Sequence, residues 1–207
     1  MIHDLSMQLV SAWHDTSWIE LIAAALAVAY LLLAIGQRLS CWLAAFISSV
    51  LYVGVYFSAR LYMESVLNVY YAAMAVYGFW QWQWQHGRRG GALAVNRWPI
   101  SRHVLAALGM VAISLVSYFF LRRYTPAAWP FVDSMVAWSS VFTTFLVARK
   151  VYENWHWWLL IDSVSVYLSY TRHLYATMLL FTLYLILIVI GMREWRRSLL
   201  LTANAVA

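Results

Sequence analysis

The chain is poor in charged residues and in cysteine. Only 11% of its 207 residues are Asp, Glu, Lys or Arg, whereas a soluble domain carries roughly a quarter. Its single cysteine, Cys41, excludes an intramolecular disulfide and a metal site built from several cysteines. So few charges cannot cover a water-facing surface when 64% of the residues are apolar. Because a membrane-spanning helix needs about 20 mostly apolar residues, the composition predicts an integral membrane protein.

The start of the chain and its basic residues exclude two further classes. The first 16 residues lack a basic start followed by an apolar stretch, so we expect no cleaved signal peptide. The net charge of +6 does not indicate nucleic-acid binding, because the basic residues form short clusters between apolar runs, as membrane topology requires.

Seven apolar segments can be drawn along the sequence. Since each segment in lipid must satisfy its own backbone hydrogen bonds, all seven are expected to be helices of an all-α membrane protein. A polar stretch at 85–102 contains three glycines and Pro99, and we expect it to be a flexible linker between two halves. The segments are 18–36, 39–59, 61–82, 103–121, 131–147, 152–170 and 174–192.

The distribution of basic residues predicts the orientation. Because Lys and Arg accumulate in cytoplasmic loops, the more basic side is expected to be cytoplasmic, with the N-terminus outside and the C-terminus inside. That side receives ten of the 14 basic residues: Arg38, Arg88, Arg89, Arg97, Arg102, Arg149, Lys150, Arg193, Arg196 and Arg197. The other side receives Arg60, Arg122, Arg123 and Arg172.

The two halves of the chain match at one fixed offset. This offset aligns Glu20 with Asp133, Trp42 with Trp155, Tyr71 with Tyr184, Gly78 with Gly191, and Trp82 with Trp195. The pattern predicts a repeat at 17–84, a linker helix at 103–121 and a second repeat at 131–193. An odd number of linker helices gives both repeats the same orientation, so the expected architecture is 3+1+3 with parallel, SWEET-like repeats. Substrate sites in such carriers lie near the midplane between the repeats.

Asp162 is the acid placed deepest in an apolar segment. A charge in the hydrocarbon core is costly and usually functional, although an acid bonded to a neighbouring helix for packing is the alternative. Trp155, Trp158, Ser165 and Ser169 share its helical face by spacings of three and four residues. This face has the composition of a substrate pocket.

The third segment offers a possible opposite wall. Glu64, Asn68 and Tyr71 follow one helical stripe that continues to Gly78 and Trp82. Asn68 lies inside the bilayer, where its amide needs partners, and it could instead join two helices. Glu64 lies nearer the outer end of its helix, where partial hydration is the alternative to substrate contact.

The remaining polar and interfacial residues are expected to have structural roles. Glu20 and Asp133 lie near outer helix ends and are interpreted as caps or hinges, and Glu194 is placed in a C-terminal tail. Tryptophans at or beyond the predicted helix ends are expected in the interfacial aromatic belts. These are Trp13, Trp18, Trp98, Trp129 and Trp195.

The chemistry of the candidate face favours an organic cation. A carboxylate neutralises the positive charge, and aromatic rings attract the cation and stack on planar groups. No histidines pair at ligand spacing, so neither a metal site nor a cofactor is expected. An enzyme is disfavoured because Ser163 and Ser165 have no histidine at their depth to activate them. A proton-coupled carrier that uses Asp162, and a purely structural membrane subunit, remain as alternatives.

Residues 153–166 read Glu-Asn-Trp-His-Trp-Trp-Leu-Leu-Ile-Asp-Ser-Val-Ser-Val, which resembles the signature of the PnuC-type vitamin transporters. Leu61-Tyr62 and residues 77–80, Tyr-Gly-Phe-Trp, resemble the third core helix of that family. The resemblance implies a homotrimer in the bacterial inner membrane, and the outside N-terminus predicted from the basic residues would then be periplasmic. It also implies facilitated diffusion of a vitamin that a cytoplasmic kinase then traps. On the matching positions, Trp155, Trp158 and Asp162 would contact the substrate, with Asn68 opposite.

The best-known substrate of that family is nicotinamide riboside, which feeds NAD synthesis. Relatives that carry thiamine or riboflavin exist. Some nicotinamide riboside carriers have an amide where this chain has Asp162, and Gln where it has Asn68. Nicotinamide riboside and thiamine both contain a ring cation that suits an acid, whereas riboflavin is neutral. Nicotinamide riboside is therefore the expected substrate, with thiamine as the alternative.

Overall fold

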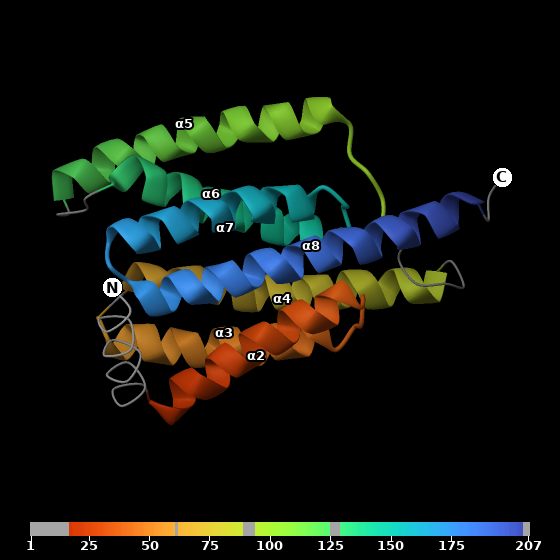
Figure 1. Cartoon of the computed structure of the whole chain (residues 1–207), viewed down its shortest axis with the longest axis horizontal. Helices are drawn as coiled ribbons and strands as arrows, with labels where there is room; N and C mark the ends of the chain where they lie inside the picture. Colours follow the sequence, from red (N-terminus) through yellow and green to blue (C-terminus); the bar gives the residue numbers. More distant parts are fainter. Residues whose placement is uncertain (1–16, 61, 89–93, 125–128, 205–207) are drawn as a thin grey trace.

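The computed structural model describes residues 17–60, 62–88, 94–124 and 129–204. These residues form seven roughly parallel or antiparallel helices that run along the long axis of the molecule (Figure 1). The helices are α2 (Trp18–Ile35), α3 (Cys41–Ser58), α4 (Tyr62–Arg88), α5 (Ile100–Tyr124), α6 (Pro130–Ala148), α7 (Asn154–Thr171) and α8 (Tyr175–Asn204).

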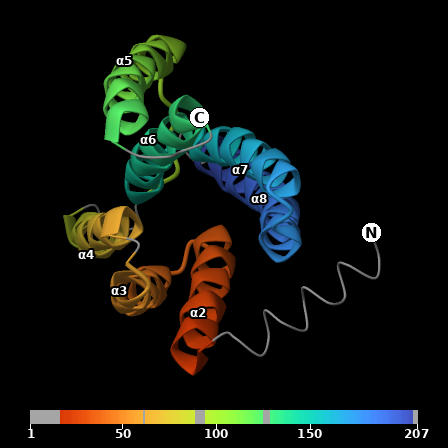
Figure 2. The same ribbon diagram turned by 90° about the vertical axis from the view of Figure 1, so that its left-hand side faces the viewer.

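The helices pack as two sets of three plus one. Helices α2, α3 and α4 form one set, and α6, α7 and α8 form the other. The sets meet where α4 packs on α6 and where α2 packs on α8, while α5 packs on α6 at the edge (Figure 2). Two interfaces therefore join the halves.

Length and hydropathy agree with a bilayer environment. In the described residues, helices α2, α3, α5 and α6 and residues 177–201 of α8 are long and apolar enough to cross a membrane. Large apolar side chains such as Leu105 and Phe119 are 72% and 69% exposed, so the outer surface is apolar, as lipid requires. Helices α4 and α7 fall outside this group, and both carry polar residues of the candidate site.

Two helices continue beyond the predicted apolar segments. Helix α4 ends at Arg88 rather than at 82, and α8 ends at Asn204 rather than at 192. An α-helix satisfies its backbone within itself, so it does not need to stop where the apolar run stops. Two predictions were wrong as a result. Glu194 is part of α8 rather than of a tail, and Trp195 is fully buried rather than in an interfacial belt.

The predicted flexible linker is largely ordered where the structure describes it. Residues 89–93 lie outside the described part, and 94–99 are held on the turn between α6 and α7. The Asn96 amide donates to the Lys150 carbonyl, and the Tyr152 amide donates to the Asn96 carbonyl, at 3.0 and 2.8 Å. The backbone amide of Trp98 donates to the Glu153 carboxylate at 3.2 Å. These bonds attach the start of α5 to the second set.

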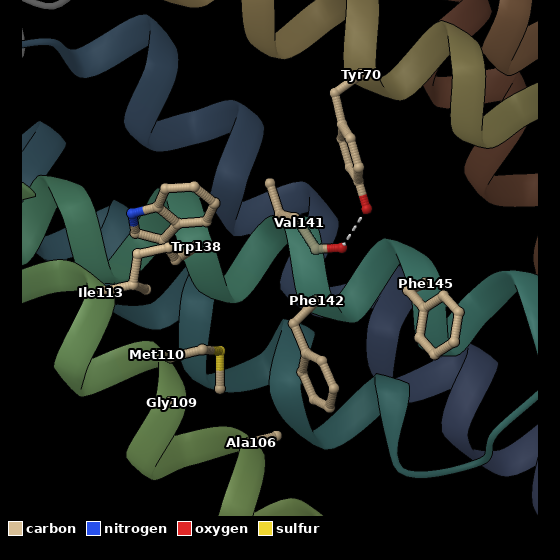
Figure 3. Close-up of a pocket in the computed structure, with 9 residues that line it drawn as sticks. All are labelled: Tyr70, Ala106, Gly109, Met110, Ile113, Trp138, Val141, Phe142 and Phe145. Carbon is tan, nitrogen blue, oxygen red and sulfur yellow. Dashed lines mark hydrogen bonds between the residues drawn. The ribbon is translucent and has the colours of Figure 1, made fainter.

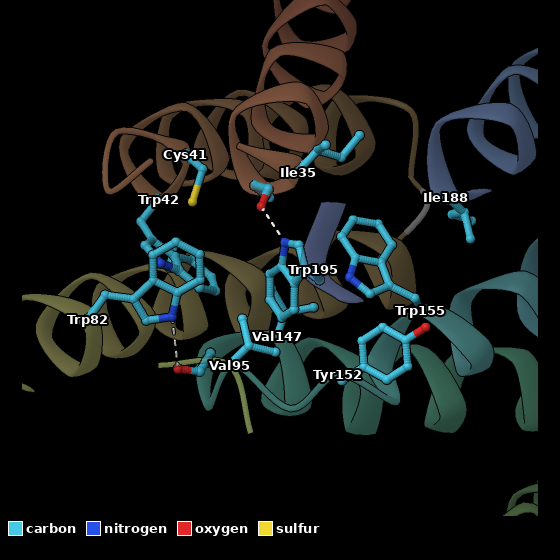
Figure 4. Packing of buried hydrophobic residues seen from close by; sticks show 13 residues of the cluster. Ile35, Cys41, Trp42, Trp82, Val95, Val147, Tyr152, Trp155, Ile188 and Trp195 are labelled. Atoms are coloured by element: carbon cyan, nitrogen blue, oxygen red, sulfur yellow. Dashed lines mark hydrogen bonds between the residues drawn. The ribbon is translucent and has the colours of Figure 1, made fainter. Parts of the chain in front are cut away.

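A cluster of four tryptophans, Trp42, Trp82, Trp155 and Trp195, forms the core at one end of the bundle (Figure 4). Trp42 packs edge-to-face on Trp82, and Trp155 packs in the same way on Trp195, both with ring centroids 5.4 Å apart. The indole N–H of Trp82 donates to the Ala148 carbonyl, and that of Trp195 donates to the Ala34 carbonyl. These carbonyls belong to the last turns of α6 and α2, where a helix lacks internal donors.

Glycines make room for two of these rings. A Cβ atom added at Gly78 would lie 2.4 Å from the Trp42 ring, and one added at Gly191 would lie 2.4 Å from the Trp155 ring. Only a residue without a side chain allows the ring to approach the helix so closely.

Two residues after each of the helices α2, α3, α6 and α7 ends, a residue lies in the left-handed region. Positive φ values occur at Gln37 and Arg60 and again at Lys150 and His173. After α2, the Arg38 amide donates to Leu33; after α6, the Val151 amide donates to Leu146. Both bonds have the 6→1 pattern of a Schellman cap. Gln37 and Lys150 stand 113 residues apart, and the same interval separates Arg60 from His173.

Candidate substrate-binding site

Asp162 lies midway along α7, and its side chain is buried, with the residue 4% exposed. Within the described part of the chain, no hydrogen-bond donor and no basic side chain contacts its carboxylate. A buried acid normally has such a partner because desolvation of a charge is expensive. The described residues therefore leave the Asp162 carboxylate without a compensating partner.

The predicted face around Asp162 is divided by the structure. Trp155 is 2% exposed and packs on Trp195 and Gly191, so it lies inside the tryptophan cluster. Trp158 is partly buried and packs against the edge of that cluster. The Ser165 hydroxyl donates to the Ile161 carbonyl of its own helix at 2.9 Å, and Ser169 is buried. Within the described residues, the Asp162 carboxylate has no hydrogen-bond partner, and neither does the buried indole N–H of Trp155 on the same face.

The predicted residues on α4 are more exposed toward its start. Glu64 is exposed, Tyr71 is partly buried, and Asn68 is 8% exposed. The Asn68 amide group donates to the Glu64 backbone carbonyl at 2.9 Å, which uses one of its hydrogens. No hydrogen bond joins Asn68 to Asp162 in the described residues. Further along the stripe, Gly78 and Trp82 belong to the tryptophan cluster.

Tyrosines that the sequence reading did not select connect the two groups of site residues. Tyr184 on α8 lies within electrostatic range of Asp162 and of Tyr56 on α3. Tyr56 in turn lies near Glu64, and its ring stacks on Tyr52 with centroids 5.3 Å apart. The alignment of Tyr184 with Tyr71 between the two halves was a sequence signal that could have identified Tyr184 as a site residue. Tyr184 thus lies near Asp162, and Tyr56 lies near Glu64.

Lys150 forms a second polar contact between the halves, at the tryptophan end. It lies in the turn after α6, is 3% exposed, and donates to Gln37 Oε1 at 3.1 Å. Its ammonium group lies 4.4 Å from the centre of the Trp82 ring, within cation–π range. Burial lowers the pKa of Lys150 to about 8. The sequence reading counted Lys150 only as a topology marker.

Near the opposite end, Asp133 has a charged partner, and Glu20 contributes its backbone amide to the cap of α2. The Arg172 guanidinium donates to both Asp133 carboxylate oxygens, at 2.8 and 3.0 Å, and so joins the end of α7 to the start of α6. The backbone amide of Glu20 donates to the Ser17 hydroxyl at the start of α2. Among the described residues, no group of three or more His, Cys, Asp or Glu side chains could hold a metal ion.

Comparison with known proteins places this arrangement among membrane transporters. Residues 17–197 match the family described as nicotinamide mononucleotide transporter. The nicotinamide riboside transporter PnuC of Escherichia coli is 26% identical over 209 residues, which covers 89% of this chain and 87% of the relative. The riboflavin/roseoflavin transporter RibM of Streptomyces davaonensis is 25% identical over 184 residues, covering 86% and 84%.

A solved structure has the same fold. The crystal structure of the vitamin B3 transporter PnuC matches with a TM-score of 0.72 at 21% sequence identity, covering 96% of this chain and 89% of that chain. The apolar helices, the family match and this fold agree with one another. The chain is a multi-pass membrane protein and belongs to the nicotinamide mononucleotide transporter family, the PnuC-type vitamin transporters.

Proposed function

We propose that this protein carries nicotinamide riboside across the bacterial inner membrane by facilitated diffusion. The observation that carries the proposal is Asp162, a buried acid without a described partner in the middle of α7. The pyridinium ring of nicotinamide riboside supplies the missing positive charge. Its flat shape suits the nearby tyrosine rings. The E. coli relative named for this substrate supports the same assignment.

The chemistry of the site separates nicotinamide riboside from the other substrates in the relatives' names. Nicotinamide mononucleotide carries an added phosphate, which the acids Asp162 and Glu64 would repel. Riboflavin is neutral and leaves the Asp162 charge uncompensated. Within the described site, Asp162 acts as counter-ion, Tyr184, Tyr56 and Trp158 as aromatic surface, and Asn68 as a hydrogen-bond partner for the ribose hydroxyls.

The proposed architecture is seven membrane spans arranged as 3+1+3 parallel repeats, with repeats at 17–84 and 131–193 joined by α5. Support comes from equivalent positions that have equivalent roles. Gln37 and Lys150 each follow the first helix of a proposed repeat, and both have positive φ. The contacts of Trp42 with Gly78 and of Trp155 with Gly191 are likewise equivalent under the same interval.

The proposed orientation has the tryptophan end in the cytoplasm and the N-terminus in the periplasm. The positive-inside distribution of Arg and Lys supports this. In this orientation, the contacts of Lys150 and Trp82 close the cytoplasmic side, and a substrate bound at Asp162 leaves inward only when they separate. We further propose a homotrimer and trapping of the substrate by a cytoplasmic kinase, both implied by family resemblance.

Binding to purified protein tests the substrate. Titration with nicotinamide riboside, followed by tryptophan fluorescence, should give saturable quenching. The Asp162→Asn variant should bind at least about tenfold more weakly, because it loses a charge-assisted contact. Asp133→Asn is the matched control, since Asp133 is already paired with Arg172. Unchanged affinity in Asp162→Asn would overturn the role of Asp162 as counter-ion. Binding of thiamine in place of nicotinamide riboside would overturn the substrate assignment.

Uptake into proteoliposomes tests the transport mode. Facilitated diffusion predicts that nicotinamide riboside equilibrates across the membrane without accumulating. A protonophore should leave the initial rate unchanged. Accumulation that depends on a proton gradient would show a proton-coupled carrier instead.

A further inference from the structure

We propose that an apolar pocket between α4, α5 and α6 binds one acyl chain of an anionic phospholipid, with the lipid headgroup held by Arg102 and Arg149. The pocket lies apart from Asp162. Its walls come from all three helices (Figure 3). It has a volume of about 380 Å³ and is lined by Tyr70, Ala106, Gly109, Met110, Ile113, Trp138, Val141, Phe142 and Phe145.

The lining selects hydrocarbon. Its two polar side-chain groups are already occupied, since the Tyr70 hydroxyl donates to the Val141 carbonyl at 2.9 Å and the Trp138 indole donates to the Ser117 hydroxyl at 3.0 Å. At Gly109, an added Cβ would meet no atom within 4 Å, so the pocket is open along this side of α5. A polar ligand would find no free partner among these groups.

Two arginines mark one end of the pocket. The Arg149 guanidinium lies 5.7 Å from the centre of the Phe145 ring and donates to the Tyr77 hydroxyl. The Arg102 guanidinium lies 5.3 Å from the Trp98 ring, whose centre is 6.2 Å from that of Phe145. Both arginines are exposed. They therefore lie where a lipid chain in the pocket would meet its headgroup.

The charge of these arginines is not compensated by the protein. In the described chain, Arg97 pairs with Glu153 and Arg172 pairs with Asp133, but no carboxylate contacts Arg102 or Arg149. Clustered basic residues beside apolar surface attract anionic lipid headgroups. The electrostatics thus favour phosphatidylglycerol over a zwitterionic lipid of the same chain length.

The dimensions match one leaflet. From Arg102 to Ile113 along α5 the helix rises about 16 Å, at 1.5 Å per residue. Half of the hydrocarbon core is about 15 Å thick. A chain anchored at Arg102 therefore reaches the far end of the pocket. The lipid would fill the seam between α5 and α6 and stabilise α5, which packs on α6 and contacts α7 near its start through His103 and Trp157.

Native mass spectrometry of the full-length protein in detergent tests the proposal, with phosphatidylglycerol and phosphatidylcholine added separately. The wild type should retain phosphatidylglycerol preferentially. The double variant Arg102→Ala/Arg149→Ala should lose about tenfold or more of this preference. The control is Arg122→Ala/Arg123→Ala at the other end of α5. sn-Glycerol 3-phosphate, a headgroup without chains, should not bind measurably.

A second pair of variants tests the pocket itself. Gly109→Leu fills it and should reduce retention of both lipids. Gly54→Leu is the matched control, because an added Cβ there also meets nothing within 4 Å and Gly54 lies on α3. Equal retention in Gly109→Leu and Gly54→Leu would overturn the proposal. So would a change of oligomer mass in Gly109→Leu without lipid loss, which would assign the pocket to a second copy of the chain. Nicotinamide riboside binding, measured in parallel, should be unchanged in all four variants, so the two proposals fail separately.

Discussion

Gly78 and Gly191 lie under the rings of Trp42 and Trp155 with no space for a methyl group. We expect Gly78→Ala and Gly191→Ala each to destabilise the protein by about 1–3 kcal/mol, the usual cost of overpacking a tight core. Thermal unfolding in detergent, followed by near-UV circular dichroism, would measure this. Gly54→Ala is the control, since its added Cβ meets nothing within 4 Å. Equal melting temperatures for all three variants would contradict the role of the close contact.

Lys150 should make stability depend on pH. Burial lowers its pKa to about 8, from 10.5 in an exposed lysine, so the folded protein gives up the proton first. Below pH 8 both states are protonated and the full cost of the buried charge is present. As pH rises from 8 toward 10.5, the unfolded state binds more protons than the folded state, and stability rises.

The comparison that isolates this effect is with Lys150→Met. The melting temperature of the wild type, relative to this variant, should increase between pH 7.5 and about 9.5. Cys41 is the titratable neighbour of Lys150, and Cys41→Ser in both proteins removes its contribution. A difference that stays constant over this range would show that the buried amine keeps its proton.

At the scale of helices, two indole hydrogen bonds tie α4 to the end of α6 and α8 to the end of α2. Trp82→Phe leaves the Ala148 carbonyl without its indole donor, whereas after Trp195→Phe the Ala34 carbonyl keeps the bond from the Gln37 backbone amide. Trp82→Phe should cost about 1–3 kcal/mol, the penalty for a buried group left unsatisfied, and Trp195→Phe about 0.5–1.5 kcal/mol, the net contribution of one hydrogen bond. Chemical unfolding in mixed micelles would measure it. Trp129→Phe, at an exposed position, should have no effect.

The helices themselves were largely predictable, because apolar runs in lipid must be helical. What hydropathy could not predict was where they end. Arg193, Arg196 and Arg197 stop the apolar run but not α8, whose backbone continues to Asn204. The burial of Trp195 follows from that extension. A residue just past an apolar segment can be core if another helix, here α2, extends to meet it.

For the site, Asp162 could be predicted because an acid within an apolar segment is conspicuous. The residues that surround Asp162 could not be predicted. Helical spacing places Trp155 and Asp162 on one face but does not say that α8 covers the part of that face containing Trp155. Tyr52, Tyr56 and Tyr184 escaped notice because tyrosine is common in such segments. Only the packing of α8 on α7 brings Tyr184 near Asp162, and only that of α3 on α4 brings Tyr56 near Glu64.

At the scale of the whole molecule, the proposed exit of substrate on the cytoplasmic side predicts that the two sets of helices separate at the tryptophan end. We expect a short bismaleimide that links cysteines at positions 37 and 150, in a Cys41→Ser background, to abolish nicotinamide riboside uptake. Binding should persist, because Asp162 is not altered. Proteoliposomes measure the uptake, and fluorescence titration of the same preparation measures the binding.

The single variant Gln37→Cys, treated with the same reagent, controls for simple modification of the turn. Full uptake by a completely cross-linked sample would mean that this end stays closed throughout transport. The substrate would then have to leave by a route that does not pass between Gln37 and Lys150.

The hydrogen bond between Gln37 and Lys150 joins two positions that correspond to each other in the proposed repeats. In a homodimer of one three-helix unit, such a position would meet its own copy across the symmetry axis, lysine against lysine or glutamine against glutamine. Two buried ammonium groups would repel each other. A single chain can place a donor on one side and an acceptor on the other. In the proposed repeats, a single chain therefore allows a pairing of unlike residues at equivalent positions that a symmetric homodimer of one unit could not have.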